Sequence, residues 1–233
     1  EQLLTSPNIQ ITACTATEYG KVLLPSSDRL TISSKRLDEQ QMISLMQNNN
    51  FNAVIDTTHP YAVIVSENIK KSADITGIPY IRLLRPKQTI NDFENVKFVS
   101  SIEEAISYLS STTENILSTI GSKELAKLCE ISDYKERIFA RILPLPDMVK
   151  QCFDMGFTGK HLICMQGPFS EELNTALIHQ FNIKYTLTKD SGKLGGFIEK
   201  VNSAKNTNTI LVVIGRPKVE QGFSYDEVIK MLL

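Results

Sequence analysis

Short apolar runs rich in β-branched residues alternate with longer helical patterns along almost the whole chain, and this alternation constrains the fold most strongly. Runs this short are typical of strands whose sheet is covered by helices on both faces. The alternation favours parallel sheets with right-handed crossovers. The predicted strands are Gln10–Ala13, Ala53–Asp56, Pro79–Leu84, Asn115–Thr119, Ile138–Arg141, His161–Gln166, Lys184–Leu187 and Thr209–Ile214. The predicted helices are Asp38–Gln47, Ala62–Ile75, Ile102–Leu109, Lys123–Cys129, Asp147–Met155, Glu171–Gln180, Gly196–Ser203 and Tyr225–Leu232.

A polar stretch of small residues, Ser110-Ser111-Thr112-Thr113, interrupts this pattern in mid-chain, and the alternation begins again after it. The chain has 233 residues, which is enough for one large domain or two small ones. We therefore predict an α/β protein of two Rossmann-like lobes, residues 1–112 and 113–233, with parallel sheets and a cleft between the lobes.

The composition disfavours several functional classes. The net charge is -1 and the pI is about 6.4, whereas nucleic-acid or membrane binding calls for a basic surplus. The sequence has no apolar run near the roughly 18 residues of a membrane span and no signal peptide, so we expect a cytoplasmic protein. Its four scattered cysteines are expected to be reduced thiols. With three distant histidines and neither an H-E-x-x-H nor a G-x-S-x-G motif, we expect no metal site and no hydrolase.

Open α/β sheets bind ligands beyond the carboxyl ends of their strands, so the loops after the predicted strands carry the candidate sites. One such loop, Asp56-Thr57-Thr58-His59-Pro60-Tyr61, combines an acid, two hydroxyls, an imidazole and a phenol. Helix capping by Asp56 or Thr58 would explain part of this loop but not His59 and Tyr61. Because imidazole titrates near neutral pH, His59 suits proton transfer.

Three loops in the second half of the chain predict anion binding. Gly121-Ser122-Lys123 offers backbone N–H groups and a positive charge, although a plain helix start would look the same. Gln166-Gly167-Pro168-Phe169-Ser170 joins a glycine that permits close approach to an N-capping serine, which predicts a phosphate or ribose contact. Thr188-Lys189-Asp190-Ser191-Gly192, followed by Gly195-Gly196, is the richest candidate, with a flexible polar loop as the alternative.

The segment Ala16-Thr17-Glu18-Tyr19-Gly20 is likewise polar and follows the first predicted strand. Arg82, Arg85 and Arg216 stand at strand ends, where arginines can pair with carboxylates. Surface solvation of these arginines is the alternative.

At these loops the chain resembles the precorrin-6A reductase and cobalt-precorrin-6A reductase family. The His59-Pro60-Tyr61-Ala62 and Gln166–Ser170 segments are the most specific. The matching segments run in family order over nearly the whole chain: Ala16–Gly20, Asp56–Ala62, Gly77–Pro86, Gly121–Lys123, Arg141–Pro144, Met165–Ser170, Thr188–Gly192, Gly195–Lys200 and Arg216-Pro217. The resemblance implies an oxidoreductase of cobalamin biosynthesis that reduces one C=C bond of (cobalt-)precorrin-6A, with hydride from NADPH or NADH, to give (cobalt-)precorrin-6B.

The tetrapyrrole substrate implied by the resemblance carries many acetate and propionate carboxylates, which suits N–H groups, hydroxyls, Lys and Arg rather than a metal site. The candidate proton donors are His59 first, then Tyr61 and Tyr19, with solvent or the substrate itself as the alternative. The candidate substrate-binding residues are Thr17, Glu18, Asp56, Thr57, Thr58 and Arg85. The candidate cofactor-binding residues are Gly121, Ser122, Lys123, Gln166, Gly167, Pro168, Phe169, Ser170, Thr188, Lys189, Asp190, Ser191 and Gly192.

Members of this family usually open with a strand and a Gly-rich turn, and this chain starts after that point. We therefore expect a leading segment before residue 1. Two rival functions stay open at this point. One is a two-lobed tetrapyrrole methyltransferase that uses S-adenosylmethionine, and the other is a non-catalytic module that binds a nucleotide as a sensor. The choice between NADPH and NADH, the presence of cobalt in the substrate, and the oligomeric state also stay open.

Overall fold

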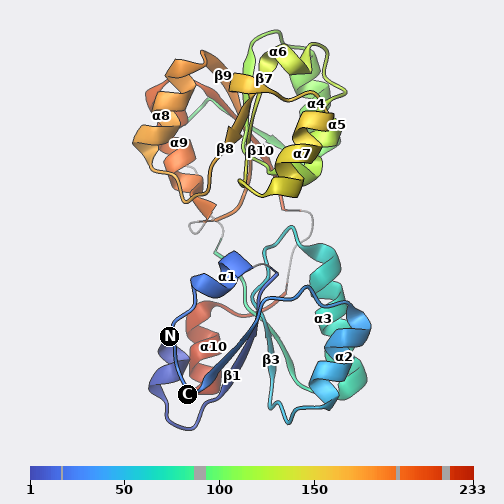
Figure 1. The fold of residues 1–233 in the computed structure, drawn as a ribbon. Helices are drawn as coiled ribbons and strands as arrows, with labels where there is room; N and C mark the ends of the chain where they lie inside the picture. The colour runs from blue at the N-terminus through green and yellow to red at the C-terminus, as the bar shows by residue number, and fades with distance from the viewer. Residues whose placement is uncertain (17, 87–92, 193–194, 217–220) are drawn as a thin grey trace. The chain divides into compact units, whose positions relative to one another are not determined.

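The computed structural model of the protein describes residues 1–16, 18–86, 93–192, 195–216 and 221–233. The chain divides into two compact units (Figure 1). Unit 1 comprises Glu1–Arg85 and Glu220–Leu233, and unit 2 comprises Pro86–Val219. Each unit has its own parallel sheets and its own set of buried side chains.

Unit 2 is built on one sheet of six strands in the order β5-β10-β9-β6-β7-β8. Every neighbouring pair in this sheet is parallel. The strands β7, β9 and β10 are almost wholly buried, as expected for a sheet covered on both faces. The strands are β5 (Val96–Val99), β6 (Asn115–Ser118), β7 (Ile138–Ile142), β8 (Leu162–Cys164), β9 (Ile183–Lys189) and β10 (Ile210–Ile214).

Helices cover both faces of this sheet: α8 and α9 lie on one face, and α4, α5 and α7 lie on the other (Figure 1). On the first face, buried Phe197 of α9 packs with Leu211 of β10, and Ile178 of α8 packs with Leu117 and Phe139. The helical segments of unit 2 are α4 (Ile102–Ser110), η2 (Ser122–Glu124), α5 (Leu125–Leu128), α6 (Tyr134–Arg137), α7 (Pro146–Asp154), η3 (Gly159–His161), α8 (Glu171–Gln180) and α9 (Phe197–Asn206).

Unit 1 contains two separate two-stranded parallel sheets, β1 (Ile11–Cys14) with β2 (Leu30–Ser33), and β3 (Val54–Asp56) with β4 (Tyr80–Arg82). A two-stranded sheet is marginally stable alone, so the helices that pack beside these pairs matter for their stability. A buried apolar cluster in unit 1 joins Met42 and Met46 of α2 to Ala73 of α3. The helical segments are η1 (Gln2–Thr5), α1 (Glu18–Val22), α2 (Glu39–Gln47), α3 (Val63–Thr76) and α10 (Tyr225–Leu232).

The last segment of the chain returns to unit 1. The Phe223 N–H donates to the Arg82 carbonyl oxygen at 2.9 Å, and the Leu84 N–H donates to the Phe223 carbonyl oxygen at 2.8 Å. These bonds extend β4 by one parallel bridge. After them, Tyr225 Oη donates to Gln2 Oε1 at 2.7 Å, which ties α10 to the first turn of the chain. Residues more than 200 positions apart therefore stabilise the same unit.

The predicted α/β class is confirmed, and each predicted strand corresponds to an observed strand. The predicted helix Lys123–Cys129 forms only as a 3₁₀ turn followed by the four-residue α5. Among the described residues, the strands β2 and β5, the short helices α1 and α6 and the 3₁₀ turns η1 and η3 were not predicted. Over the part of the chain that the structure describes, every helix is too short or too polar to span a membrane.

The border between the units differs from the boundary predicted at residue 112. Although β5 and α4 precede that residue, they belong to unit 2, because β5 pairs with β10 and α4 packs beside both strands. In contrast, α10 follows the predicted boundary but belongs to unit 1 through the bonds of Phe223. The predicted ranges 1–112 and 113–233 therefore do not coincide with the compact units. The two differences arise because β5 and Phe223 each pair with a segment that is distant in sequence.

Candidate functional site

The polar loops of unit 2 gather at one edge of its sheet. Because all six strands are parallel, their carboxyl ends lie at the same edge. From β6 the sheet continues through β7 to β8 on one side, whereas β9 and β10 lie on the other side of β6. In open α/β sheets, ligands bind beyond the carboxyl edge where the strand order reverses in this way. The loops that follow β6 and β9 flank that point.

The loop after β6 carries Gly121, Ser122 and Lys123, which were predicted to bind the cofactor. Gly121 has a φ of 83°, which favours glycine, and no atom of the described residues lies within 4 Å of the place of a Cβ atom. The backbone at this turn is therefore open to a ligand. However, the predicted helix Lys123–Cys129 is only a 3₁₀ turn followed by the four-residue α5, so no long helix begins at this loop.

The loop after β9 is held in place by its own polar groups. Arg216 Nε lies 3.1 Å from Asp190 Oδ2, so this arginine at a strand end pairs with a carboxylate, which is one of the two alternatives left open from the sequence. Ser191 Oγ donates to the Gly195 carbonyl oxygen at 3.3 Å. A Cβ atom at Gly195 would lie 2.1 Å from Ser191 Oγ, so the close approach of these two residues requires glycine.

The loops after β6 and β9 are also tied to each other. The backbone N–H and the hydroxyl of Thr119 each donate to the Leu187 carbonyl oxygen at 2.9 Å. Lys189 Nζ lies 3.7 Å from Glu124 Oε1, and burial lowers the pKa of Lys189. The side chain of Thr188 is buried beside them. The structure thus brings the predicted residues 121–123 and 188–192 to one place.

The third predicted loop, Gln166–Ser170, follows β8 at the end of the sheet. Ser170 Oγ accepts the Leu173 N–H at 3.3 Å, which confirms the predicted N-cap of α8. The guanidinium of Arg141 lies over the ring of Phe169, with Cζ 3.8 Å from the ring centroid. Arg141 Nη1 donates to Asn174 Oδ1 at 2.8 Å. The Phe169 backbone lies about 4 Å from the place of a Cβ atom at Gly196, so this loop meets the start of α9.

Lys200 of α9 lies in the same region, and its Nζ donates to the Gly195 carbonyl oxygen at 2.8 Å. Burial, with a smaller effect from the charge of Arg141, lowers the pKa of Lys200 to about 8. Burial alone lowers the pKa of Arg141 to about 10. Neither residue was assigned a role from its sequence context. A signal was present for Arg141, which is the one charged residue of the strand Ile138–Ile142.

In unit 1, the Asp56 carboxylate at the end of β3 is 0% exposed and is the centre of a polar network. Arg82 Nη1 lies 2.8 Å from Asp56 Oδ1, Tyr80 Oη donates to Asp56 Oδ2 at 2.8 Å, and the Thr58 N–H donates to Asp56 Oδ1 at 2.9 Å. Burial raises the pKa of Asp56, but hydrogen bonds from Thr58 and Tyr80 and the charge of Arg82 outweigh it and hold the pKa below its usual value. Arg82 Nη1 also donates to Thr58 Oγ1 at 2.9 Å.

This network shows which interpretations of the loop were wrong. The N-cap of α3 is Ala62 rather than Asp56 or Thr58, and the Asp56 side chain instead holds the turn that follows β3. Arg82, which was left between ion pairing and surface solvation, is buried and ion-paired. Tyr80 was not predicted to have a role of its own. Its hydrogen bond to Asp56 joins β4 to β3, which are distant in sequence.

The remaining predicted residues of unit 1 lie around this network or beyond the described atoms. The Tyr61 N–H donates to His59 Nδ1 at 3.4 Å, and the centroids of the two rings are 5.4 Å apart. Arg85 Nη2 donates to the Thr57 carbonyl oxygen at 3.4 Å. Glu18 accepts a hydrogen bond from Ser34. Thr17 lies outside the described residues, as does the side chain of Tyr19.

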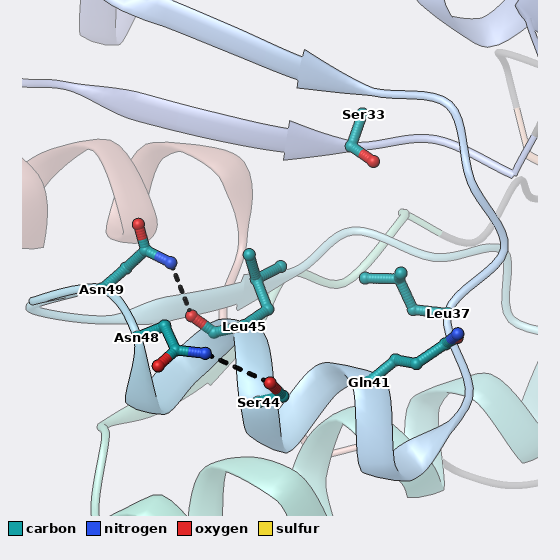
Figure 2. A pocket seen from close by; sticks show the side chains of 7 residues that line it. All are labelled: Ser33, Leu37, Gln41, Ser44, Leu45, Asn48 and Asn49. Carbon is teal, nitrogen blue, oxygen red and sulfur yellow. Dashed lines mark hydrogen bonds between the residues drawn. The ribbon is translucent and has the colours of Figure 1, made fainter.

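A hollow of about 350 Å³ lies beside α2 in unit 1 (Figure 2). Two hydrogen bonds at its rim stabilise the end of α2, from Asn49 Nδ2 to the Leu45 carbonyl oxygen and from Asn48 Nδ2 to Ser44 Oγ. It is lined by Ser33, Leu37, Gln41, Ser44, Leu45, Asn48 and Asn49. None of these side chains titrates near neutral pH, so the hollow lacks the groups of a catalytic site. The described residues also contain no cluster of three potential metal ligands.

The fold and these loops define a doubly wound, parallel α/β protein with its polar groups at the carboxyl edge of the main sheet. The family model described as "Precorrin-6x reductase CbiJ/CobK" matches residues 1–233. The chain therefore belongs to this reductase family, which confirms the resemblance drawn from its loops.

Similar proteins agree with this assignment. The chain is 34% identical over 230 residues to "Cobalt-precorrin-6A reductase" of Priestia megaterium, with 96% of the chain and 89% of the relative covered. It is 31% identical to the protein of the same name from Salmonella typhimurium, with 92% and 81% covered. A solved structure, "CobK precorrin-6A reductase", shares the fold with a TM-score of 0.76 at 18% identity, and covers 99% of this chain and 90% of its own.

Loss of the Arg82 charge tests the buried network of unit 1. Arg82→Met would leave the Asp56 carboxylate buried without its cation, and we expect the free energy of unfolding to fall by about 3–5 kcal/mol. Tyr80→Phe removes one hydrogen bond to that carboxylate and should cost about 2 kcal/mol. Urea unfolding followed by circular dichroism measures both values. Lys71→Met, which breaks an exposed ion pair on α3, is the control and should change unfolding little. A loss at Arg82 no larger than that of the control would contradict the network.

The low pKa of Lys200 predicts a pH dependence of stability. Its pKa is about 8 in the folded protein, whereas an unfolded lysine titrates near about 10.4. Between these values the unfolded chain holds a proton that the folded chain has released, so the free energy of unfolding rises with pH. We expect the wild type to gain about 2–3 kcal/mol relative to Lys200→Met over this range, measured by urea unfolding at a series of pH values. Lys205→Met, an exposed lysine of α9, should show no such gain, and parallel curves for wild type and Lys200→Met would refute the assignment.

Proposed function

We propose that this protein reduces one carbon–carbon double bond of the precorrin-6A macrocycle to give precorrin-6B, in the cobalt-containing form. The match of residues 1–233 to the reductase family carries this proposal. Relatives named "Cobalt-precorrin-6A reductase" are 34% and 31% identical over more than nine tenths of the chain. The relative named "Precorrin-6A reductase" from Sinorhizobium sp is 24% identical over 74% of the chain. This difference favours the cobalt form of the substrate.

We further propose that the reductant is NADPH or NADH, which supplies a hydride when it is bound. The residues of unit 2 suit such a dinucleotide, because Gly121 leaves its backbone open and Lys189 of the neighbouring loop adds a positive charge. The predicted cofactor-binding loops are 121–123, 166–170 and 188–192. In this proposal their N–H groups and hydroxyls hold the phosphates and riboses, and the apolar sheet behind them excludes water from that side.

Saturation of a C=C bond needs a proton in addition to the hydride, and we propose that His59 donates it. Because His59 Nδ1 accepts the Tyr61 N–H, Nε2 is the ring atom that would carry the transferred proton in this proposal. Tyr61 and Tyr19 are the next candidates. Glu18, Thr57, Thr58 and Arg85 line the substrate side in this proposal, together with Thr17. Asp56 acts as a positioning residue, since its buried carboxylate holds the Thr58 turn.

The proposed reaction is tested by following absorbance at 340 nm with each pair of NADPH or NADH and precorrin-6A or cobalt-precorrin-6A. We expect oxidation of one nicotinamide with cobalt-precorrin-6A, and a slower rate with the metal-free form. Absence of oxidation with all four pairs would reject the reductase proposal. Binding of S-adenosylmethionine in place of a dinucleotide would then favour a methyltransferase, and dinucleotide binding without turnover would favour a sensor.

Substitution of His59 tests the proton donor. We expect His59→Ala to lower kcat by about 10²–10⁴-fold while the Kd of the dinucleotide changes little, because the ring acts on the proton and not on the cofactor. The measurement is a kcat profile from pH 6 to pH 9 together with a dinucleotide titration. His179→Ala is the matched control, since His179 is exposed in the last turn of α8. An unchanged kcat for His59→Ala across the pH range would assign the proton to another group.

A further inference from the structure

Two buried cations of unit 2, Arg141 and Lys200, have no acidic partner. Arg141 of β7 is 5% exposed and Lys200 of α9 is 7% exposed. Within the residues that the structure describes, no carboxylate lies within 4 Å of either charge. Burying an unpaired charge is costly, so buried cations are normally paired with acids. This pair therefore departs from what stability alone would favour.

Among the described residues, the contacts of the two side chains leave most of their donors unused. Arg141 donates one hydrogen bond to a described residue, from Nη1 to Asn174, although a guanidinium carries five N–H groups. Lys200 donates one within the same part of the chain, to the Gly195 carbonyl oxygen, although an ammonium carries three. Phe169 covers one face of the guanidinium by a cation–π contact, which fixes its plane without neutralising its charge. Both groups are thus held in position with donors left for a ligand.

The nearest acidic residue does not neutralise the pair. Glu199 raises the pKa of Lys200 only as the smallest of three influences, and Arg141 lowers it by like-charge repulsion. The Glu199 Oε2 atom is buried and has no hydrogen-bond partner among the described residues. The pKa of Lys200 is therefore influenced more by the charge of Arg141 than by the charge of Glu199.

The backbone beside these cations adds to the positive potential. The ten-residue helix α9 begins after Gly196, and no side chain caps its first N–H groups. The N-terminal end of a helix carries a partial positive charge and binds anions through such groups. Gly195 has no room for a Cβ atom, and Gly196 has a φ of 64°, so this turn requires its two glycines. The Phe169 backbone borders the same turn.

We propose that Arg141 and Lys200, with the turn at Gly195-Gly196, form a subsite that binds a phosphate or carboxylate group of a ligand. The proposal deepens the proposed function, on which it rests for the source of the anion: the dinucleotide would offer phosphates, and the tetrapyrrole would offer carboxylates. A bound anion would accept hydrogen bonds from the unused donors of both side chains and would neutralise their charge. This accounts for their burial without an acidic partner.

Calorimetric titration of the full chain with pyrophosphate and with tricarballylate, at constant ionic strength, tests the subsite. We expect the wild type to bind at least one of these probes. Lys200→Met and Arg141→Met should each raise its Kd at least about 10-fold, whereas Lys205→Met, on the same helix, should leave it unchanged. Urea unfolding without a probe provides a second readout. Lys200→Met should be at least as stable as the wild type, because it removes an uncompensated buried charge.

The results separate the possible outcomes. Failure of the wild type to bind either probe, or equal affinity in Lys200→Met, would overturn the subsite. So would a clear loss of probe-free stability in Lys200→Met with binding retained, since that pattern marks a structural role. If the wild type prefers pyrophosphate and the two variants have a raised Kd for NADPH, the subsite belongs to the dinucleotide. If the wild type prefers tricarballylate and the two variants have a raised KM for the tetrapyrrole, the subsite belongs to the substrate. If the wild type binds an anion, Lys200→Met does not, and the protein oxidises no nicotinamide, the subsite would stand and the reductase proposal would be rejected.

Discussion

Burial of the six-stranded sheet on both faces is the constraint on which the rest of unit 2 depends. With α8 and α9 on one side and α4, α5 and α7 on the other, side chains of the central strands are mostly apolar on both faces. Polar chemistry is then concentrated at the strand ends, and parallel strands place all their carboxyl ends at one edge. The reversal of strand order between β6 and β9 brings the loops 121–123 and 188–192 together there. The location of the candidate site is therefore a consequence of how the core is covered.

Unit 1 depends more on a polar network than on a core. Its strands have three or four residues and pair only two by two, and its buried apolar cluster is small. The Asp56–Arg82 ion pair joins β3 to β4, and Phe223 from the end of the chain pairs with the Arg82 backbone. The same network sets the conformation of the turn at Thr58, directly before His59. Stability and the geometry of the proposed proton donor are therefore coupled through one buried carboxylate.

The local pattern of apolar and polar residues was enough to predict the α/β fold class, the strongly apolar strands and the loops that follow them. It was not enough for β5, whose residues Lys97 and Phe98 are exposed at the edge of the sheet, nor for β2, where hydroxyl residues alternate with apolar ones. The unit border was missed because the partners of β5 and Phe223 lie more than 100 residues away. For a related reason, Arg82 was left between ion pairing and surface solvation, and Arg141 was assigned no role. The sequence alone does not show whether a charged residue in a strand is solvated or buried, because its surroundings are formed by residues that are distant in sequence.

The two buried charges of Asp56 and Lys200 illustrate opposite solutions to one problem. Desolvation disfavours a charge in each case, and for Asp56 the fold supplies three donors that restore the charged form. For Lys200 the fold supplies one carbonyl and a neighbouring cation, so the cost of burial persists in the protein alone. A fold that retains such a cost gains when an anion binds, because binding to the folded state stabilises it in proportion to the affinity. Both reactants of the proposed reduction carry anionic groups. In the proposed subsite, the uncompensated pair of unit 2 gives up stability in favour of ligand binding, whereas the compensated pair of unit 1 serves the fold itself.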